Sequence, residues 1–273
     1  MINRISRELT SEANMIIVDC HVHVALHMYE PVEMLLTQMQ YNNVEKTVLV
    51  QSSTTTDNSY IIECKQRFPT RLAVVCRVDE ESSTAVDDLQ RWHEAGADSI
   101  RLRNFNRSPG ADPLAIWRKA GELGMPVSAG GKVEGFITNE FANLVETLPN
   151  LKIVIEHLGG IGSNAVHDAK PTKEQFQKVL DLSRFPNTYI KIHGMGEFCD
   201  PPFPYQDIPP YLEMAYDAFG AQRMAWGSDY PPVLMREGYR NSLQFTMEQM
   251  PFCSKEELEW VFGKTALSLW NFS

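Results

Sequence analysis

The feature that most constrains the fold is an alternation that runs through almost the whole chain. Short segments rich in β-branched residues are each followed by a segment with helical periodicity. We predict eight strands, at residues 16–23, 47–51, 72–78, 99–103, 126–130, 153–158, 188–193 and 224–228. From the third to the sixth, their starts lie about 27 residues apart, which accommodates one strand and one crossover helix. The pattern predicts a single-domain (β/α)8 TIM barrel over residues 15–273, preceded by a polar arm at residues 1–14.

Several helix boundaries also have recognisable sequence signals. Proline, capping-box residues and glycine mark where a helix begins or ends. The expected signals are Pro31 before a helix, Asp112 and Pro113 as N-cap and first-turn proline, Thr172 with Gln175 and Ser254 with Glu257 as capping boxes, and Gly220 as a C-terminal glycine. An open doubly wound sheet is the alternative architecture. It is disfavoured because no glycine-rich phosphate-binding motif follows any predicted strand.

Composition narrows the class of partner. The formal net charge of −10 argues against nonspecific nucleic-acid binding, and no apolar run approaches the length needed to span a bilayer. The polar opening lacks the apolar core of a signal peptide, and the five cysteines are odd in number without a C-x-x-C pair. We therefore expect a cytoplasmic protein that acts on a small molecule without nucleic acid or membrane, with a homo-oligomer left open.

In a barrel of this type, the chemistry lies at the carboxyl ends of the strands. Those ends supply a short list of polar side chains: His21, His23, Gln51, Ser52, Arg77, Asp79, Arg101, Arg103, Ser128, His157, Lys191, His193 and Asp229. His21 and His23 share one face of their strand, opposite Cys20 and Val22, because successive side chains alternate. Their alternative role is to cap the strand and bind loops.

Four of these residues have two open interpretations. Asp229 precedes Tyr230 and two prolines, so its carboxylate is held in place as a general base or metal ligand, or else it caps a turn. Lys191 is either a site residue or a buried ion-pair partner. Arg101 and Arg103 share an inward face and suit a substrate carboxylate, although one of the pair could bind Asp79 or Glu156 instead. We expect only one arginine to touch substrate.

Three motifs in order resemble the amidohydrolase superfamily. They are residues 19–23 (DCHVH), 155–160 (IEHLGG) and 226–231 (WGSDYP), and the closing VFGKTA at 261–266 is similar to the last helix of one branch. That branch holds sugar lactonases, 2-pyrone-4,6-dicarboxylate lactonase and zinc decarboxylases. The resemblance covers the chain from about residue 15 to its end.

The resemblance implies hydrolysis of a small, carboxylate-bearing lactone. Asp229 would be the general base, His21 and His23 would polarise the carbonyl, and His157 would orient water or share the oxyanion. His193, Gln51 and one of Arg101 and Arg103 would bind substrate.

Metal binding is left open by the same resemblance. His21, His23 and Asp229 would hold one divalent metal, zinc first, with His157 or His193 as a fourth ligand; the metal-independent lactonases of the branch use the same groups without an ion. Gly130 stands where the zinc decarboxylases have a histidine ligand. The alternative functions are a zinc-dependent nonoxidative decarboxylase and a barrel that binds a ligand without turnover.

Overall fold

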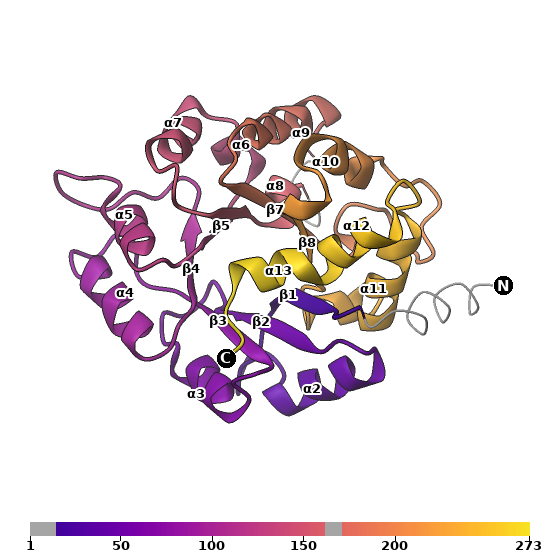
Figure 1. The fold of residues 1–273 in the computed structure, drawn as a ribbon, viewed down its shortest axis with the longest axis horizontal. Coiled ribbons are helices and arrows are strands. Elements are labelled where there is room, and N and C mark those ends of the chain that lie inside the picture. Colours follow the sequence, from indigo (N-terminus) through magenta and orange to yellow (C-terminus); the bar gives the residue numbers. More distant parts are fainter. Residues whose placement is uncertain (1–14, 162–170) are drawn as a thin grey trace.

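A computed structural model describes residues 15–161 and 171–273, so the arm predicted at residues 1–14 lies outside the described part of the chain. Eight parallel strands stand in sequence order in one sheet, which confirms the predicted (β/α)8 barrel (Figure 1). The strands are β1 (Val18–Val22), β2 (Lys46–Val50), β3 (Leu72–Cys76), β4 (Ser99–Arg103), β5 (Val127–Gly130), β6 (Ile153–Ile155), β7 (Thr188–Ile192) and β8 (Met224–Trp226).

Helices accompany the strands, and most of them form a ring outside the barrel (Figure 1). They are α2 (Val32–Tyr41), α3 (Ser59–Arg67), α4 (Ala85–Glu94), α5 (Ala115–Glu122), α6 (Val133–Phe136), α7 (Asn139–Thr147), α8 (His157–Gly160), α9 (Lys173–Leu180), α10 (Tyr211–Phe219), α11 (Tyr239–Glu248), α12 (Lys255–Glu259) and α13 (Thr265–Leu269). Both capping boxes and the glycine that ends α10 are confirmed. The N-cap predicted at Asp112 is wrong: α5 begins at Ala115, because the Asp112 carboxylate instead accepts from the Leu114 N–H and closes a turn before the helix.

Two apolar layers hold the barrel together. The larger lies between strands and helices, where side chains such as Leu35, Ile100 and Trp117 are fully buried. The smaller joins residues of β1, β2, β3, β6 and β8 to Trp270, directly after α13. The last helix therefore closes one end of the barrel interior, and Figure 1 shows α13 crossing the ring of strands.

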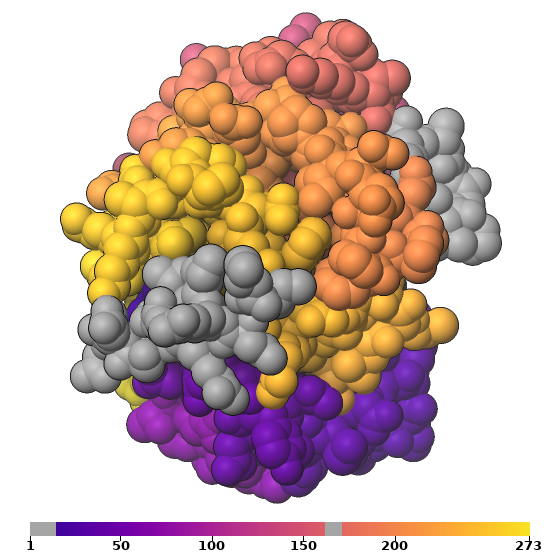
Figure 2. Space-filling model, turned by 90° about the vertical axis from the view of Figure 1, so that its right-hand side faces the viewer, coloured from indigo at the N-terminus to yellow at the C-terminus, as the bar shows by residue number. Residues whose placement is uncertain are grey.

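The seam between β8 and β1 is made by individual hydrogen bonds. The His23 N–H donates to the Tyr230 carbonyl at 2.7 Å, and the Asp229 N–H donates to the His21 carbonyl at 2.9 Å. The buried Asp19 carboxylate accepts from the Ser228 N–H at 2.8 Å. The first and last units of the chain thus meet and close the ring, and Figure 2 shows C-terminal segments in yellow bordering the indigo first unit.

One prediction about β1 is wrong. Cys20 and Val22 do not share a face, because the pairing register with β2 shifts between Asp19 and Val22. Cys20 packs with the barrel interior, whereas Val22 packs with the outer layer. Such an irregularity re-aims side chains, and here it turns His21 and His23 together toward the mouth of the barrel.

Candidate active site

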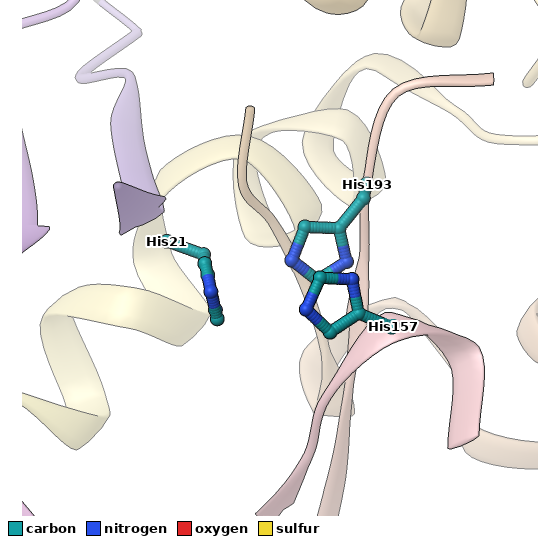
Figure 3. Close-up of side chains that lie close together, drawn as sticks. All are labelled: His21, His157 and His193. Atoms are coloured by element: carbon teal, nitrogen blue, oxygen red, sulfur yellow. The ribbon is translucent and has the colours of Figure 1, made fainter. Parts of the chain in front are cut away.

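Five predicted residues converge at the carboxyl ends of the strands. His21 lies in β1 and His23 directly follows it, His157 follows β6, His193 follows β7 and Asp229 follows β8. The His21 ring centre lies 5.0 Å from that of His23, 5.0 Å from that of His157 and 4.9 Å from that of His193. Asp229 Oδ1 lies 3.6 Å from His23 Nε2 and 3.9 Å from His21 Nε2. Figure 3 shows His157 and His193 stacked beside the His21 ring.

The backbone at two of these residues is unusual. His157 has φ 51° and Asp229 has φ 57°, both in the left-handed region that residues other than glycine rarely adopt. Only Asn43 and Leu158 share that property among the non-glycine residues in the described ranges 15–161 and 171–273. Strained backbone of this kind costs free energy and concentrates at functional sites, where it fixes a side chain in a required direction.

A charged network surrounds His157 and Asp229. His157 Nδ1 donates to the Glu197 carboxylate at 2.8 Å, and Arg236 donates to Asp229 Oδ2 at 3.1 Å. Arg236 also lies 3.5 Å from Glu197, so it links the two carboxylates. Burial alone would lower the pKa of His157, but Glu197 outweighs it and raises that pKa above its usual value. Burial alone would raise the pKa of Asp229, yet the charged groups around it, His157 among them, lower that pKa, so Asp229 is ionised at neutral pH.

His23 is oriented by its second ring nitrogen. Its Nδ1–H donates to the Val50 carbonyl at 2.7 Å, so a neutral His23 ring presents the lone pair of Nε2 to Asp229. Tyr29 stacks on the His23 ring, with centres 5.3 Å apart and planes 16° apart. The half-buried Tyr29 ring therefore forms one wall beside the Asp229 carboxylate.

A second polar layer lies deeper in the barrel. Lys191 Nζ lies 3.3 Å from His21 Nδ1 and donates to Ser128 Oγ at 2.8 Å. Ser128 in turn donates to Glu156 Oε1 at 2.7 Å. Burial alone would raise the pKa of Glu156, but Arg101 and Lys191 lower it to about 2, so a carboxylate is buried here in its charged form. Lys191 is thus the buried ion-pair partner of one prediction, and its role as a site residue stays a prediction.

The two arginines of β4 differ in what they bind. Arg101 donates to Glu156 Oε2 from Nε at 2.9 Å and from Nη2 at 2.8 Å, so this arginine takes the ion-pair alternative rather than substrate binding. The Arg103 guanidinium makes no hydrogen bond or ion pair within the described part of the chain, and only its backbone N–H is engaged, by Glu80. Arg103 is therefore the arginine whose guanidinium N–H groups have no acceptor among the described residues.

The Gln51 side chain is engaged in its own loop. Its amide donates to the Asp57 carbonyl at 2.6 Å and its oxygen accepts from the Ser52 N–H at 2.8 Å. Substrate binding by Gln51 stays a prediction, and the structure supports a role for this side chain in shaping the loop after β2.

A metal would find a suitable set of groups here, with one misfit. The ligand atoms of His21, His23 and Asp229 lie within 4.8 Å of one another, so the triad could hold a divalent ion. His23 fits that role, because a carbonyl on the far nitrogen leaves Nε2 free. His21 fits poorly, since the Lys191 amine lies 3.3 Å from its far nitrogen, nearer than the Glu156 carboxylate at 3.7 Å.

Three site residues have no equivalent in the sequence predictions: Tyr29, Glu197 and Arg236. Each lies in a loop that follows β1, β7 or β8, and loops at this end of a barrel carry function. The sequence signal was weak. Glu197 follows His193 by four residues and Arg236 follows Asp229 by seven, but neither spacing points to a site unless the loop conformation is known.

The structure thus places a buried carboxylate amid four imidazoles at the mouth of a (β/α)8 barrel, a set of groups suited to proton transfer and to metal binding. The chain belongs to the amidohydrolase family, whose model matches residues 18–272. It is 26% identical over 204 residues to the 4-sulfomuconolactone hydrolase of Hydrogenophaga intermedia, covering 71% of this chain and 60% of that protein. It is 25% identical over 208 residues to the L-fucono-1,5-lactonase of Burkholderia ambifaria, covering 70% of this chain and 66% of that protein.

The fold is also similar to that of a crystal structure of an amidohydrolase from Burkholderia multivorans with bound zinc. The TM-score is 0.75 at 18% identity, over 93% of this chain and 98% of the other. None of the helices in the described ranges is long and apolar enough to cross a membrane.

Proposed function

We propose that this protein opens the ring of a small, acidic lactone by hydrolysis. One observation carries the proposal: the Asp229 carboxylate is buried, ionised and within 4 Å of His21 and His23 at the mouth of the barrel. The names of the two relatives, both of which describe lactone-opening enzymes, support the same reaction class.

Different residues carry out proton transfer and charge stabilisation in this reaction. Asp229 removes a proton from water, and the hydroxide oxygen bonds to the lactone carbonyl carbon. His21 donates to the carbonyl oxygen as negative charge develops on it. When the tetrahedral intermediate collapses, the ring carbon–oxygen bond breaks and the departing alkoxide takes the proton held by Asp229. Glu197 raises the pKa of His157, and in its protonated form His157 adds positive charge next to the oxyanion, while His193 contacts the substrate.

Arg103 is the residue we assign to the carboxylate of the substrate. Its guanidinium is half-buried at the end of β4, the same end that carries the histidines, and it has no partner in the described ranges. Arg101 is unsuited to that role because Glu156 already neutralises it. A guanidinium binds a carboxylate through two parallel hydrogen bonds, so an acidic lactone should be preferred over a neutral sugar lactone.

A zinc-dependent decarboxylase is the weaker alternative, and Gly130 counts against it. A Cβ at this position would lie 2.7 Å from Glu156 Oε2 and 3.6 Å from Arg101 Nε. The space for a strand-5 histidine ligand is therefore taken by the Glu156–Arg101 ion pair. Zinc at His21, His23 and Asp229 stays a prediction; a bound ion would act as a Lewis acid on the carbonyl. A cytoplasmic location is also part of the proposal, supported by the odd number of cysteines and the lack of a C-x-x-C pair.

The proposal is tested by Asp229→Asn in a pH-indicator assay over acidic and neutral lactones. We expect kcat to fall by about 10²- to 10⁴-fold on the best substrate, because amide cannot accept the proton of water. The matched control is Asp79→Asn, which changes an exposed carboxylate at the end of β3 and should keep full activity. Wild-type activity in a folded Asp229→Asn protein would remove Asp229 from the mechanism and refute the proposal.

A further inference from the structure

We propose that Lys191 is a positioning residue that places the single ring proton of His21 on Nε2. The two histidines of the H-V-H motif then carry opposite tautomers: His21 donates to the lactone carbonyl oxygen, and His23 accepts from the attacking water. The catalytic part of this inference rests on the proposed function, whereas the tautomers themselves do not.

The direction of each hydrogen bond follows from the groups around Lys191. Ser128 has one hydroxyl proton and donates it to Glu156, so Ser128 accepts from Lys191. The Glu156 carboxylate lies 3.9 Å from Lys191 Nζ, and the amine stands 5.3 Å above the Trp270 ring. A carboxylate and an aromatic face both stabilise an ammonium group. Glu156 Oε1 lies 3.7 Å from His21 Nδ1, beyond hydrogen-bond distance, whereas Lys191 Nζ lies at 3.3 Å. An ammonium has donors only, so it leaves His21 Nδ1 as the acceptor.

The His21 proton must then sit on the nitrogen that faces the site. The ring is neutral, because an imidazolium would place an N–H on Nδ1 against the Lys191 ammonium 3.3 Å away, and a neutral ring has one proton. His21 Nε2 is buried and has no hydrogen-bond partner in the described ranges. It is therefore a donor that is desolvated and aimed at the place where the carbonyl oxygen would lie, as oxyanion stabilisation requires.

His23 has the opposite arrangement. Its Nδ1–H is committed to the Val50 carbonyl, and the Nε2 lone pair faces Asp229 Oδ1 at 3.6 Å. Two acceptors at that separation do not bond to each other, but one water molecule can donate a hydrogen to each. Water held in this way presents its lone pair to the carbonyl carbon, and its proton already points at the base.

The same tautomer weakens the metal triad. A divalent ion needs the Nε2 lone pair of His21, and in this tautomer a proton occupies it. Removing Lys191 should therefore have two consequences besides any change in activity. The His21 proton should be free to move from Nε2 to Nδ1, and the affinity for divalent metal should rise.

The test is the ring nitrogen spectrum of the histidines by long-range ¹H–¹⁵N NMR, with His21→Gln used to assign the His21 signals. Wild type should show His21 protonated on Nε2 and His23 on Nδ1. Lys191→Met keeps side-chain length and leaves Glu156 paired with Arg101; its His21 should shift toward the Nδ1–H form. Titration with zinc chloride should show affinity at least about 10-fold higher than in wild type.

Lys65→Met is the matched control, because Lys65 is a largely buried, ion-paired lysine on α3 away from the site. It should keep both the wild-type spectrum and the wild-type zinc affinity. A wild-type His21 protonated on Nδ1 would overturn the inference, and so would a Lys191→Met spectrum identical to wild type. If Lys191→Met does not fold, the wild-type spectrum alone decides. An absence of lactone turnover would refute the proposed function but would not affect the tautomer result.

Discussion

Two arginines separated by one residue on β4 should behave very differently when they are replaced. Arg101→Met leaves the buried Glu156 carboxylate with one cation fewer, and losing one member of a buried ion pair costs about 3–5 kcal/mol. Arg103→Met removes no described ion pair, so its unfolding free energy should stay near wild type. Its KM for an acidic lactone should instead rise about 10- to 100-fold with kcat little changed, as expected for a lost charge-assisted hydrogen bond.

Urea unfolding and steady-state kinetics on both variants separate these roles. Each arginine serves as the control for the other, since the chemical change is the same. Equal losses of stability, or an unchanged KM in Arg103→Met, would contradict the assignment of Arg103 to the substrate carboxylate.

At the level of elements, the sequence predicted the features that periodicity determines and few of those that depend on loop conformation. All eight strands and the convergence of His21, His23, His157, His193 and Asp229 were predicted, because strand order in a barrel fixes which ends meet. The register shift in β1 was missed, since alternation assumes a regular strand. Glu197 and Arg236 were missed because their places depend on loops whose shape no spacing rule determines.

A further prediction follows from the close approach of Gly227 to His21 at the seam between β8 and β1. A Cβ at this position would lie 2.7 Å from His21 Cβ and 2.8 Å from the His21 backbone nitrogen, too close for the two strands to stay in place. Gly227→Ala should lower the unfolding free energy by about 1–3 kcal/mol. It should also lower kcat, because the displaced backbone carries His21.

Gly121→Ala is the matched control for that substitution. Its Cβ would meet Leu151 only at 3.9 Å, an ordinary contact, inside helix α5. Alanine is favoured over glycine within a helix, so this variant should be neutral or slightly more stable. Calorimetry on both proteins gives the comparison, and a Gly227→Ala protein as stable as Gly121→Ala would refute the close approach at the seam.

Across the whole molecule, burial makes the fold depend on pH through acids that resist ionisation. Burial raises the pKa of Asp19 to about 6 and that of Glu80 to about 7. An acid whose pKa is higher in the folded state binds protons more tightly there than in the unfolded chain. Stability is therefore greatest below the unfolded pKa and is lost as the pH rises through the folded pKa.

Glu80 allows this dependence to be isolated. It is buried, and its carboxyl group accepts from the Arg103 N–H, a role that a glutamine oxygen can also fill. The ordinary pKa of a glutamate is 4.5. Between that pH and about pH 7, the unfolding free energy of wild type should fall by up to roughly 3 kcal/mol, and that of Glu80→Gln should not. Urea unfolding from pH 5 to pH 8.5 should show that the unfolding free energy of the variant rises relative to that of wild type as the pH rises. Glu81→Gln, at the exposed neighbour, should follow wild type; parallel curves for wild type and Glu80→Gln would show that Glu80 ionises freely in the folded barrel.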